Sequence, residues 1–401
     1  MFKYLLKFRR PAAIAGAIAA SALLAACGSG GGGSEAESGT LRLALTDSPA
    51  CGYDQVNVTI QKVRVHKSST AGDGDSGWSE VVLSPAKRVD LLTLQNGVLA
   101  ELGQTPLPTG KYTQMRLVLA ANDATTPTAN SVVLSDTKAE IPLTTPSAFQ
   151  TGLKLNVNID VAADKVADFV LDFEACRSVV KRGNSGEYNL KPVVSVTARV
   201  SDAANRVIGY VPAALGIGTT MVSAQQDGVP KKSTTPDATG KFVLSPLDAG
   251  TYDVVIAAAD RVTATVTGVI VSSTANTVLN DSTLPITPDP STTHKASGTV
   301  TTGVSPIDAV VVARKAYTGG PTVEVAGGPV NGTSGTFSYD LPIGAPVKAL
   351  YAVAPATLVF SSDSASAGKY TLVATSGGVT KTHIPDINVT SADVTEVPFA
   401  F

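Results

Sequence analysis

The chain has 401 residues and a formal net charge of −2, with 31 basic and 33 acidic residues. This length is too great for one hydrophobic core and predicts two or three domains. The near-neutral charge, with no concentrated basic segment, argues against nucleic acid as a partner. Thr, Ser, Val, Ala and Gly are abundant, whereas there are only 3 Met and 1 Trp, so the composition predicts an all-β protein.

Residues 1–26 have the layout of a secretory signal peptide. A basic start is followed by an apolar, alanine-rich run that ends in Leu24-Ala25-Ala26-Cys27. The run is shorter than the roughly 20 residues that a transmembrane helix needs. The four closing residues resemble the lipobox of bacterial lipoproteins. This resemblance implies cleavage before Cys27, which becomes the new N-terminus, a diacylglyceryl thioether with palmitate-type chains on its sulfur, and anchoring in a membrane. Gly28 stands where an inner-membrane retention signal has Asp, which implies the outer membrane.

Residues 27–40 follow the predicted cleavage site and are mostly Gly, Ser and Glu. They predict a flexible linker between the anchor and the folded body. An ordinary cleaved signal peptide with an incidental cysteine is the alternative. Once Cys27 is lipidated, Cys51 and Cys176 remain as a pair in an oxidising compartment, so we expect a disulfide bond between them. Two buried free thiols are the alternative to this bond.

Residues 41–200 read as an N-terminal β-domain. Apolar and polar residues alternate strictly from Leu153 to Val161, which predicts a strand with one face in the core and one in water. Alternation also runs through an earlier strand, but its phase changes between Ile60 and Val63. One extra residue there predicts a β-bulge near Gln61 or Lys62.

The same region resembles an uncharacterised domain found near the N-terminus of many bacterial lipoproteins, one of the numbered domains of unknown function. This resemblance implies a β-sandwich and no particular activity. The residues that carry the resemblance are Leu45–Pro49, Val56–Ile60, Asp90–Leu92, Leu107–Tyr112, Leu171–Phe173 and Leu190–Pro192.

Four acidic residues of this domain form a candidate metal site. A bond between the two cysteines would bring Asp47 and Asp54 close to Asp172 and Glu174, and converging carboxylate oxygens are the ligands that Ca²⁺ prefers. The alternative is that these acids are solvated beside basic residues or form turns. No other cofactor is expected.

A second acidic segment, Asp73–Gly77 with Glu80, has a weak similarity to a calcium-binding loop. Its glycine falls one position early, and no acid occupies the twelfth position of the loop pattern. We therefore expect a polar hairpin tip at this segment.

Two segments behind this domain, 205–284 and 294–401, repeat each other with a period near ninety residues. Gly240-Lys241-Phe242 corresponds to Gly335-Thr336-Phe337, and each segment continues into a turn and a further strand. The strand order resembles carboxypeptidase regulatory-like and collagen-adhesin B-type modules, which implies transthyretin-like sandwiches that act as spacers or present ligands. The second segment departs from the pattern, with Ala345-Pro346 where the tyrosine-bearing strand should start.

Some adhesin modules of that class carry a bond between a lysine and an asparagine beside an acid. Lys295, Glu324 and Asn388 have the residue types for this bond. No aligned motif supports the trio, so an unlinked module is the favoured interpretation.

No catalytic motif stands out in the sequence. The histidines are His66 in the first predicted domain and His294 and His383 in the last, without the spacing of a metal or triad site, and no nucleophile elbow or phosphate-binding loop is present. We therefore expect a non-enzymatic outer-membrane lipoprotein of tandem β-sandwich domains that binds an envelope protein or glycan ligand or acts in adhesion. A periplasmic scaffold or assembly partner is the alternative, and an envelope hydrolase using paired carboxylates is the least favoured one.

Overall fold

The structure is a computed structural model that describes residues 37–48, 52–145, 151–183, 185–199, 204–216, 218–353 and 357–401. The predicted signal peptide, most of the predicted linker, Cys27 and Cys51 lie outside these ranges. Within them, no helix has the length and apolar character needed to cross a membrane. Nearly all regular structure is β-strand, which confirms the predicted fold class.

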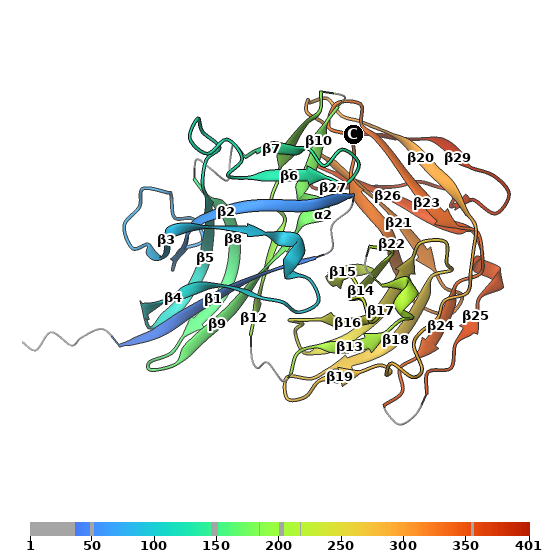
Figure 1. Cartoon of the computed structure of the whole chain (residues 1–401), viewed down its shortest axis with the longest axis horizontal. Coiled ribbons are helices and arrows are strands. Elements are labelled where there is room, and N and C mark those ends of the chain that lie inside the picture. The colour runs from blue at the N-terminus through green and yellow to red at the C-terminus, as the bar shows by residue number, and fades with distance from the viewer. Residues whose placement is uncertain are drawn as a thin grey trace, which may run out of the picture. The chain divides into compact units, whose positions relative to one another are not determined.

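The first part of the described chain, which we name sandwich 1, contains a four-stranded and an eight-stranded sheet (Figure 1). The smaller sheet has the order β12-β9-β1-β4, and the larger has the order β10-β11-β7-β6-β2-β5-β8, with β3 paired to β2. The elements are β1 (Ser38–Ser48), β2 (Tyr53–His66), β3 (Ser79–Asp90), the 3-10 helix η1 (Leu91–Leu94), β4 (Ala100–Pro108), β5 (Gly110–Leu119), β6 (Ser131–Leu134), β7 (Glu140–Thr144), β8 (Leu153–Val161), β9 (Val166–Glu174), α2 (Ala175–Ser178), β10 (Val179–Arg182), β11 (Glu187–Leu190) and β12 (Val194–Ala198).

The next part, sandwich 2, has a small sheet of order β16-β13-β19 and a larger one of order β15-β14-β17-β18-β24-β25. Its elements are β13 (Val207–Tyr210), η2 (Ala213–Leu215), β14 (Thr220–Gln226), β15 (Val229–Thr234), β16 (Lys241–Leu244), β17 (Gly250–Ala258), β18 (Ala264–Val271) and β19 (Thr277–Val278), together with β24 (Val347–Leu350) and β25 (Ser361–Ser362) from later in the chain.

The last part, sandwich 3, has a small sheet of order β23-β20-β29 and a larger one of order β22-β21-β26-β27, with β28 paired to β26. Its elements are β20 (Thr293–Thr301), β21 (Ala309–Ala316), β22 (Thr322–Pro329), β23 (Thr336–Pro342), η3 (Ser364–Ser366), β26 (Lys369–Ser376), β27 (Val379–Thr382), β28 (Ile387–Asn388) and β29 (Val394–Ala400).

All three sandwiches share one topology. In each small sheet, the first strand has one antiparallel and one parallel neighbour. The antiparallel pairs are β1 with β4, β13 with β16 and β20 with β23. The parallel pairs are β1 with β9, β13 with β19 and β20 with β29. In each larger sheet, a central strand lies between two antiparallel neighbours: β2 between β3 and β5, β14 between β15 and β17, β21 between β22 and β26. The repetition therefore extends to the N-terminal domain, where the sequence did not show it.

Each sandwich also has its own hydrophobic core. Leu171 and Phe173 are fully buried in the first core, Phe242 in the second, and Leu372 in the third. Burial of side chains of this size contributes about 1.5–3 kcal/mol each. One residue, Val255, belongs to the larger sheet of sandwich 2 but packs into the core of sandwich 3.

Two predictions for sandwich 1 are confirmed by the strand register. The alternating segment forms β8 over Leu153–Val161, with Leu155 and Ile159 buried. The pairing of β2 with both β3 and β5 shifts between Ile60 and Lys62, where the sequence predicted a bulge.

The correspondence between the two later modules holds at the level of contacts. Gly240 and Gly335 both have positive φ, at 82° and 68°, and a Cβ atom at either would lie about 2 Å from a backbone carbonyl oxygen, that of Val211 or Val300. Val211 and Val300 also bind these glycines through their amides, which donate hydrogen bonds to the Gly240 and Gly335 carbonyls at 2.9 Å. Only glycine fits both the conformation and the space at these two positions.

A tyrosine fixes the crossing between the two sheets in every sandwich. The hydroxyl groups of Tyr112 and Tyr252 each donate 2.9 Å hydrogen bonds to the carbonyl four residues earlier, at Pro108 and Asp248. The Tyr370 hydroxyl makes the equivalent 2.7 Å bond to a residue 28 positions earlier, Pro342. The tyrosine-bearing strand of sandwich 3 is therefore β26. The departure from the pattern at Ala345-Pro346 has a structural reason, because an insertion separates the two halves of the corner.

The insertion spans residues 343–367, and its described parts, 343–353 and 357–367, reach sandwich 2. Its strand β24 pairs in parallel with β18, from Ala264 opposite Val347 to Thr267 opposite Leu350. The side chains of Val347, Tyr351, Leu358 and Phe360 pack against the core of sandwich 2. One sheet thus draws strands from both of the segments that the sequence divided at 284 and 294. We name this insertion the clasp.

We expect the corner hydroxyl groups to contribute measurably to stability. Tyr252→Phe leaves the Asp248 carbonyl without its hydrogen bond and should lower the free energy of unfolding by about 0.5–1.5 kcal/mol in urea titrations. Tyr112→Phe should behave in the same way. Tyr53→Phe is the matched control, because within the described part of the chain no hydrogen bond from the Tyr53 hydroxyl is found, and it should have little effect. Equal stability of all four proteins would contradict the corner.

Candidate functional site

The acids that the sequence singled out lie where sandwich 1 meets the other two. Asp172 is on β9, paired with Thr46 of β1 on one side and Ser195 of β12 on the other, with its side chain on the outer face of the smaller sheet. The outer face of a sheet normally faces water, yet Asp172 is only 4% exposed. Sandwich 2 covers it.

Sandwich 2 supplies a cation to Asp172. Lys232 of β15, itself 3% exposed, places its Nζ atom 2.6 Å from a carboxylate oxygen of Asp172. Burial raises the pKa of the Asp172 carboxyl group, and the Lys232 charge opposes that rise. A buried charge pair of this kind is sensitive to the loss of either member, because the remaining charge cannot reach water.

A second set of contacts joins sandwich 1 to sandwich 3. Arg177, in the short helix α2, forms ion pairs with Glu174 at 3.3 Å and with Glu324 of β22. Burial raises the pKa values of both Glu174 and Glu324, and Arg177 opposes the rise in each case. The guanidinium group thus holds two partly buried carboxylates from different sandwiches.

Glu324 also connects sandwich 3 to sandwich 2 through its main chain. The Gln225 side chain accepts from the Glu324 amide at 2.8 Å and donates to the Glu324 carbonyl at 2.7 Å. These two bonds satisfy the edge of β22 as a neighbouring strand would. Gln225 is fully buried, so both of its polar atoms need such partners.

We name these side chains the junction: Asp172, Glu174, Arg177, Gln225, Lys232 and Glu324. Near the middle of Figure 1, α2, β15 and β22 come together, and all three elements contribute to it. A further contact lies beside it, where Asn96 of sandwich 1 donates to the Lys241 carbonyl and accepts from the Val243 amide in sandwich 2.

The candidate calcium site is not formed by these acids. The Asp47 carboxylate accepts from the Ala175 amide at 3.0 Å and so stabilises the start of α2. Asp54 lies apart at the surface and pairs with Lys138 at 2.8 Å, which lowers the pKa of its carboxyl group. Asp172 and Glu174 do lie close together, but Lys232 and Arg177 compensate them. Among the described residues, no group of three or more His, Cys, Asp or Glu is arranged to hold a metal ion.

The expected disulfide has one end in the described chain. Cys176 lies in α2 and is disulfide-bonded. Its expected partner, Cys51, lies outside the described residues, so the pairing stays a prediction. Cys27 also lies outside the described residues, so its lipidation stays a prediction.

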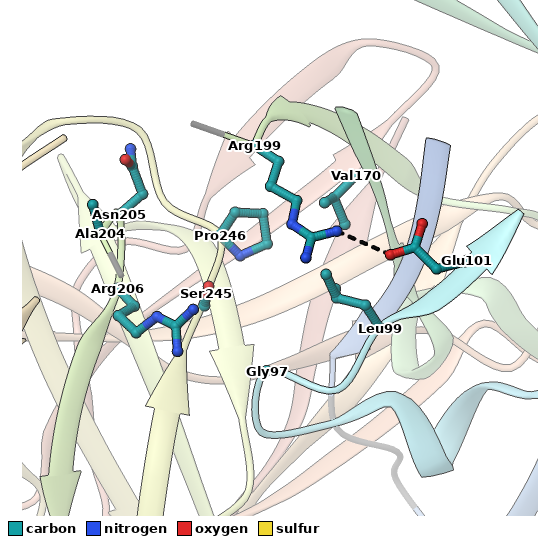
Figure 2. A pocket seen from close by; sticks show the side chains of 10 residues that line it. All are labelled: Gly97, Leu99, Glu101, Val170, Arg199, Ala204, Asn205, Arg206, Ser245 and Pro246. Carbon is teal, nitrogen blue, oxygen red and sulfur yellow. Dashed lines mark hydrogen bonds and ion pairs between the residues drawn. The ribbon is translucent and has the colours of Figure 1, made fainter. Parts of the chain in front are cut away.

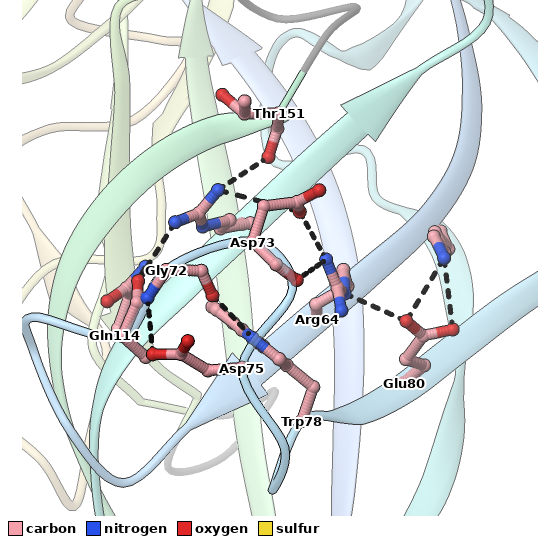
Figure 3. Close-up of polar contacts among 11 residues, drawn as sticks. Arg64, Gly72, Asp73, Asp75, Trp78, Glu80, Gln114 and Thr151 are labelled. Carbon is pink, nitrogen blue, oxygen red and sulfur yellow. Dashed lines mark hydrogen bonds and ion pairs between the residues drawn. The ribbon is translucent and has the colours of Figure 1, made fainter.

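The second acidic segment forms the connection between β2 and β3, as a polar hairpin tip (Figure 3). Asp73 pairs with Arg64, while Glu80 pairs with Lys62 at 3.0 Å and Arg64 at 2.8 Å. Arginine and lysine therefore occupy the carboxylate oxygens that a calcium ion would need.

A single aromatic side chain holds this connection against the sheet. The Trp78 ring lies 4.6 Å from the Arg64 guanidinium carbon and 5.1 Å from that of Arg116, and its indole nitrogen donates to the Gly72 carbonyl. Figure 3 shows Trp78, Arg64 and Gly72 around the loop. Cation–π contacts of this kind contribute about 0.5–2 kcal/mol each.

The candidate lysine–asparagine bond of sandwich 3 is also not formed. Lys295 pairs with Asp340 at 2.8 Å, Glu324 belongs to the junction, and Asn388 accepts from the Thr390 amide. The three side chains have separate partners, so the prediction of an unlinked module is the better one.

A polar cavity of about 410 Å³ flanks the contact between sandwiches 1 and 2. Arg199, paired with Glu101 at 3.0 Å, lines one side, while Arg206 and Asn205 line the other (Figure 2). Sequence reasoning missed this cavity and also the roles of Lys232 and Gln225. Neither residue stood out in the sequence, because β15 is mostly polar and Gln225 lies at the polar end of β14.

Comparisons with known proteins bear on the N-terminal region. Residues 38–192 match a family model described as "Domain of unknown function (DUF4382)". This match confirms the resemblance inferred for that region, and it covers less than half of the chain. No curated protein matches the sequence.

Several solved structures show similarity. A type II cohesin–X–dockerin complex from Acetivibrio cellulolyticus is 26% identical over 22% of this chain and 58% of its own chain, with a TM-score of 0.19. A streptococcal ancillary pilin is 12% identical, covering 91% of this chain and 99% of its own, with a TM-score of 0.16. The major pilin of Corynebacterium diphtheriae is 11% identical with the same coverage and a TM-score of 0.18. TM-scores this low do not establish a common overall arrangement.

The buried pair of the junction gives a sharp expectation. Lys232→Met should lower the free energy of unfolding by about 3–5 kcal/mol, because Asp172 is left charged in the interior. The double variant Lys232→Met, Asp172→Leu should recover most of that loss in urea titrations. Lys138→Met, which breaks an exposed pair, is the control and should change stability little. A double variant as unstable as the single one would contradict the pairing.

The pKa of Glu174 predicts a pH dependence. Because burial raises its pKa in the folded protein, ionising it opposes folding, so its contribution to stability is greatest below the unfolded value of about 4.3 and falls as the pH rises. Glu174→Gln cannot ionise, so its stability relative to the parent protein should rise from pH 4 to pH 7. Asp54, whose pKa is lowered, is the opposite case: Asp54→Asn should lose relative stability as the pH rises from 2 to 5. Parallel pH profiles for the parent and Glu174→Gln would contradict the assignment.

Proposed function

We propose that this chain is a non-enzymatic, lipid-anchored protein of the bacterial outer membrane that acts in ligand binding or adhesion. Its ligand would be an envelope protein or a glycan. The proposed anchor is inferred from the lipobox ending in Cys27, and the glycine-rich segment behind it would act as a flexible linker between the membrane and the folded body. The observation that carries the proposal is the junction, which joins three sandwiches into one folded unit.

The junction suits a protein that holds a surface in place. Ordinary domain interfaces within one chain permit relative motion unless they are extensive and buried. Here Lys232 and Arg177 each place a buried charge contact across a different interface, and the clasp adds a strand of one sandwich to the sheet of another. Separating the sandwiches would expose both charge contacts and the apolar residues of the clasp.

The junction also weakens the hydrolase alternative. A glycosidase needs two carboxyl groups that face each other across a space for substrate, one of them able to accept or donate a proton there. Asp172 is bound to Lys232, Asp47 to the start of α2, and Glu174 to Arg177. None of these contacts leaves a substrate position between two of the carboxylates.

The test is protease accessibility of an epitope-tagged protein on intact and permeabilised cells. If the protein binds its ligand at the cell surface, the protease should digest it on intact cells. Protection until the cells are permeabilised would contradict this proposal and favour the alternative, a periplasmic scaffold. A Cys27→Ser protein is the control for the anchor and should leave the membrane fraction. Retention of that variant in the membrane would contradict lipid anchoring.

A further inference from the structure

The larger sheet of sandwich 2 extends past the smaller one. Strand β16 of the smaller sheet contacts β14 and β15, whereas β19, at its other edge, contacts β18. The larger sheet continues beyond β18 with β24 and β25, the two strands of the clasp. The described strands of the smaller sheet therefore end opposite β18, and the clasp extends past them.

A cavity of about 680 Å³ lies between the clasp and residues 278–287. Leu358 and Phe360 line it from the clasp, and both also pack against the core of sandwich 2. From the other segment it is lined by Leu284, which is 61% exposed although it is apolar. Apolar side chains at this end of the larger sheet thus remain partly in water.

The amide and carboxylate side chains at this cavity already have partners within the chain. The Asn280 amide group bonds to the Tyr210 main chain and to the Leu284 carbonyl. The Asp281 carboxylate accepts from the Thr283 and Leu284 amides. Since both side chains are engaged, the cavity fits an apolar surface better than a polar ligand.

The clasp is also the open edge of the larger sheet. β25 pairs with β24 on one side, and no described strand pairs with it on the other. Just before β25, the backbone groups of residues 357–360 make no hydrogen bond within the described part of the chain. Unpaired N–H and C=O groups along a sheet edge are a template for a further strand.

The segment at this edge lacks the usual protection against strand addition. Its sequence, Thr357-Leu358-Val359-Phe360-Ser361-Ser362, has no charged residue, Pro or Gly. Edge strands normally carry charge or proline, because uncharged β-forming segments associate. Side chains on its outer side are also apolar: Val359 is 78% exposed, and Leu350 of β24 is 74% exposed.

We propose that this edge is a dimer interface, at which residues 357–362 pair antiparallel with the same segment of a second copy of the chain. The two six-stranded sheets then form one continuous sheet. Antiparallel pairing about a twofold axis brings the same face of both segments together, so apolar side chains meet apolar side chains on each face. An uncharged segment is complementary to itself in this arrangement. The dimer is independent of the ligand that the protein binds.

Sedimentation velocity of the Cys27→Ser chain without its signal peptide tests this interface. The parent protein should form dimers whose fraction rises with concentration. Val359→Lys should raise the dimer dissociation constant by about tenfold or more, because like charges then lie close together across the twofold axis. Val304→Lys is the matched control: this valine of sandwich 3 is 71% exposed, and its substitution should leave the dissociation constant unchanged.

A second variant tests the backbone pairing itself. The Asp363 amide donates to the Pro346 carbonyl, so the amide of the preceding residue, Ser362, faces the open side of the edge. Ser362→Pro removes only that outward N–H group and should also weaken the dimer.

Thermal unfolding of each variant verifies its folding. The proposal is overturned if the parent protein is monomeric, if Val359→Lys and Ser362→Pro dimerise as well as the parent, or if Val304→Lys weakens the dimer as much as Val359→Lys does.

Discussion

The burial of Asp172 is the constraint on which the rest of this structure depends. A carboxylate on the outer face of a sheet is ordinarily solvated, but here sandwich 2 closes over it and must supply Lys232. Once that pair is buried, β15 is held against β1 and β9, and Gln225 on the neighbouring strand reaches the edge of β22. Arg177 then completes the contact from sandwich 1 to sandwich 3. The three sandwiches are arranged around a few polar groups that have no access to water.

One topology occurs three times in the chain, although the sequence shows the repeat only in the two later segments. The Gly-x-Tyr corner recurs at Tyr112, Tyr252 and Tyr370, and each hydroxyl group ties the crossing between two sheets. In the third copy the corner tolerates the clasp, because the Tyr370 hydroxyl still reaches the Pro342 carbonyl, whereas the shorter copies have one residue between the corresponding carbonyl and the glycine. The insertion therefore joins two sandwiches without disturbing the core of either.

Sequence patterns predicted whatever depends on local periodicity. The alternation through β8 and the phase change at Ile60 come directly from side-chain spacing along a strand, and both are confirmed. The roles of Asp172, Lys232 and Glu324 could not be predicted, because a charged residue at an outward position looks solvated until another domain covers it. The same reason explains why the candidate calcium site is not formed: acids that look unpartnered in the sequence are paired with cations from other strands.

The central claim is that the sandwiches form one cooperative unit, and scanning calorimetry of the chain without its signal peptide tests it most directly. A single unfolding transition, with calorimetric and van 't Hoff enthalpies in agreement, is what the junction and the clasp predict. Separate transitions, each matching the unfolding of one isolated sandwich, would show that the polar contacts do not couple the three parts and would contradict the account.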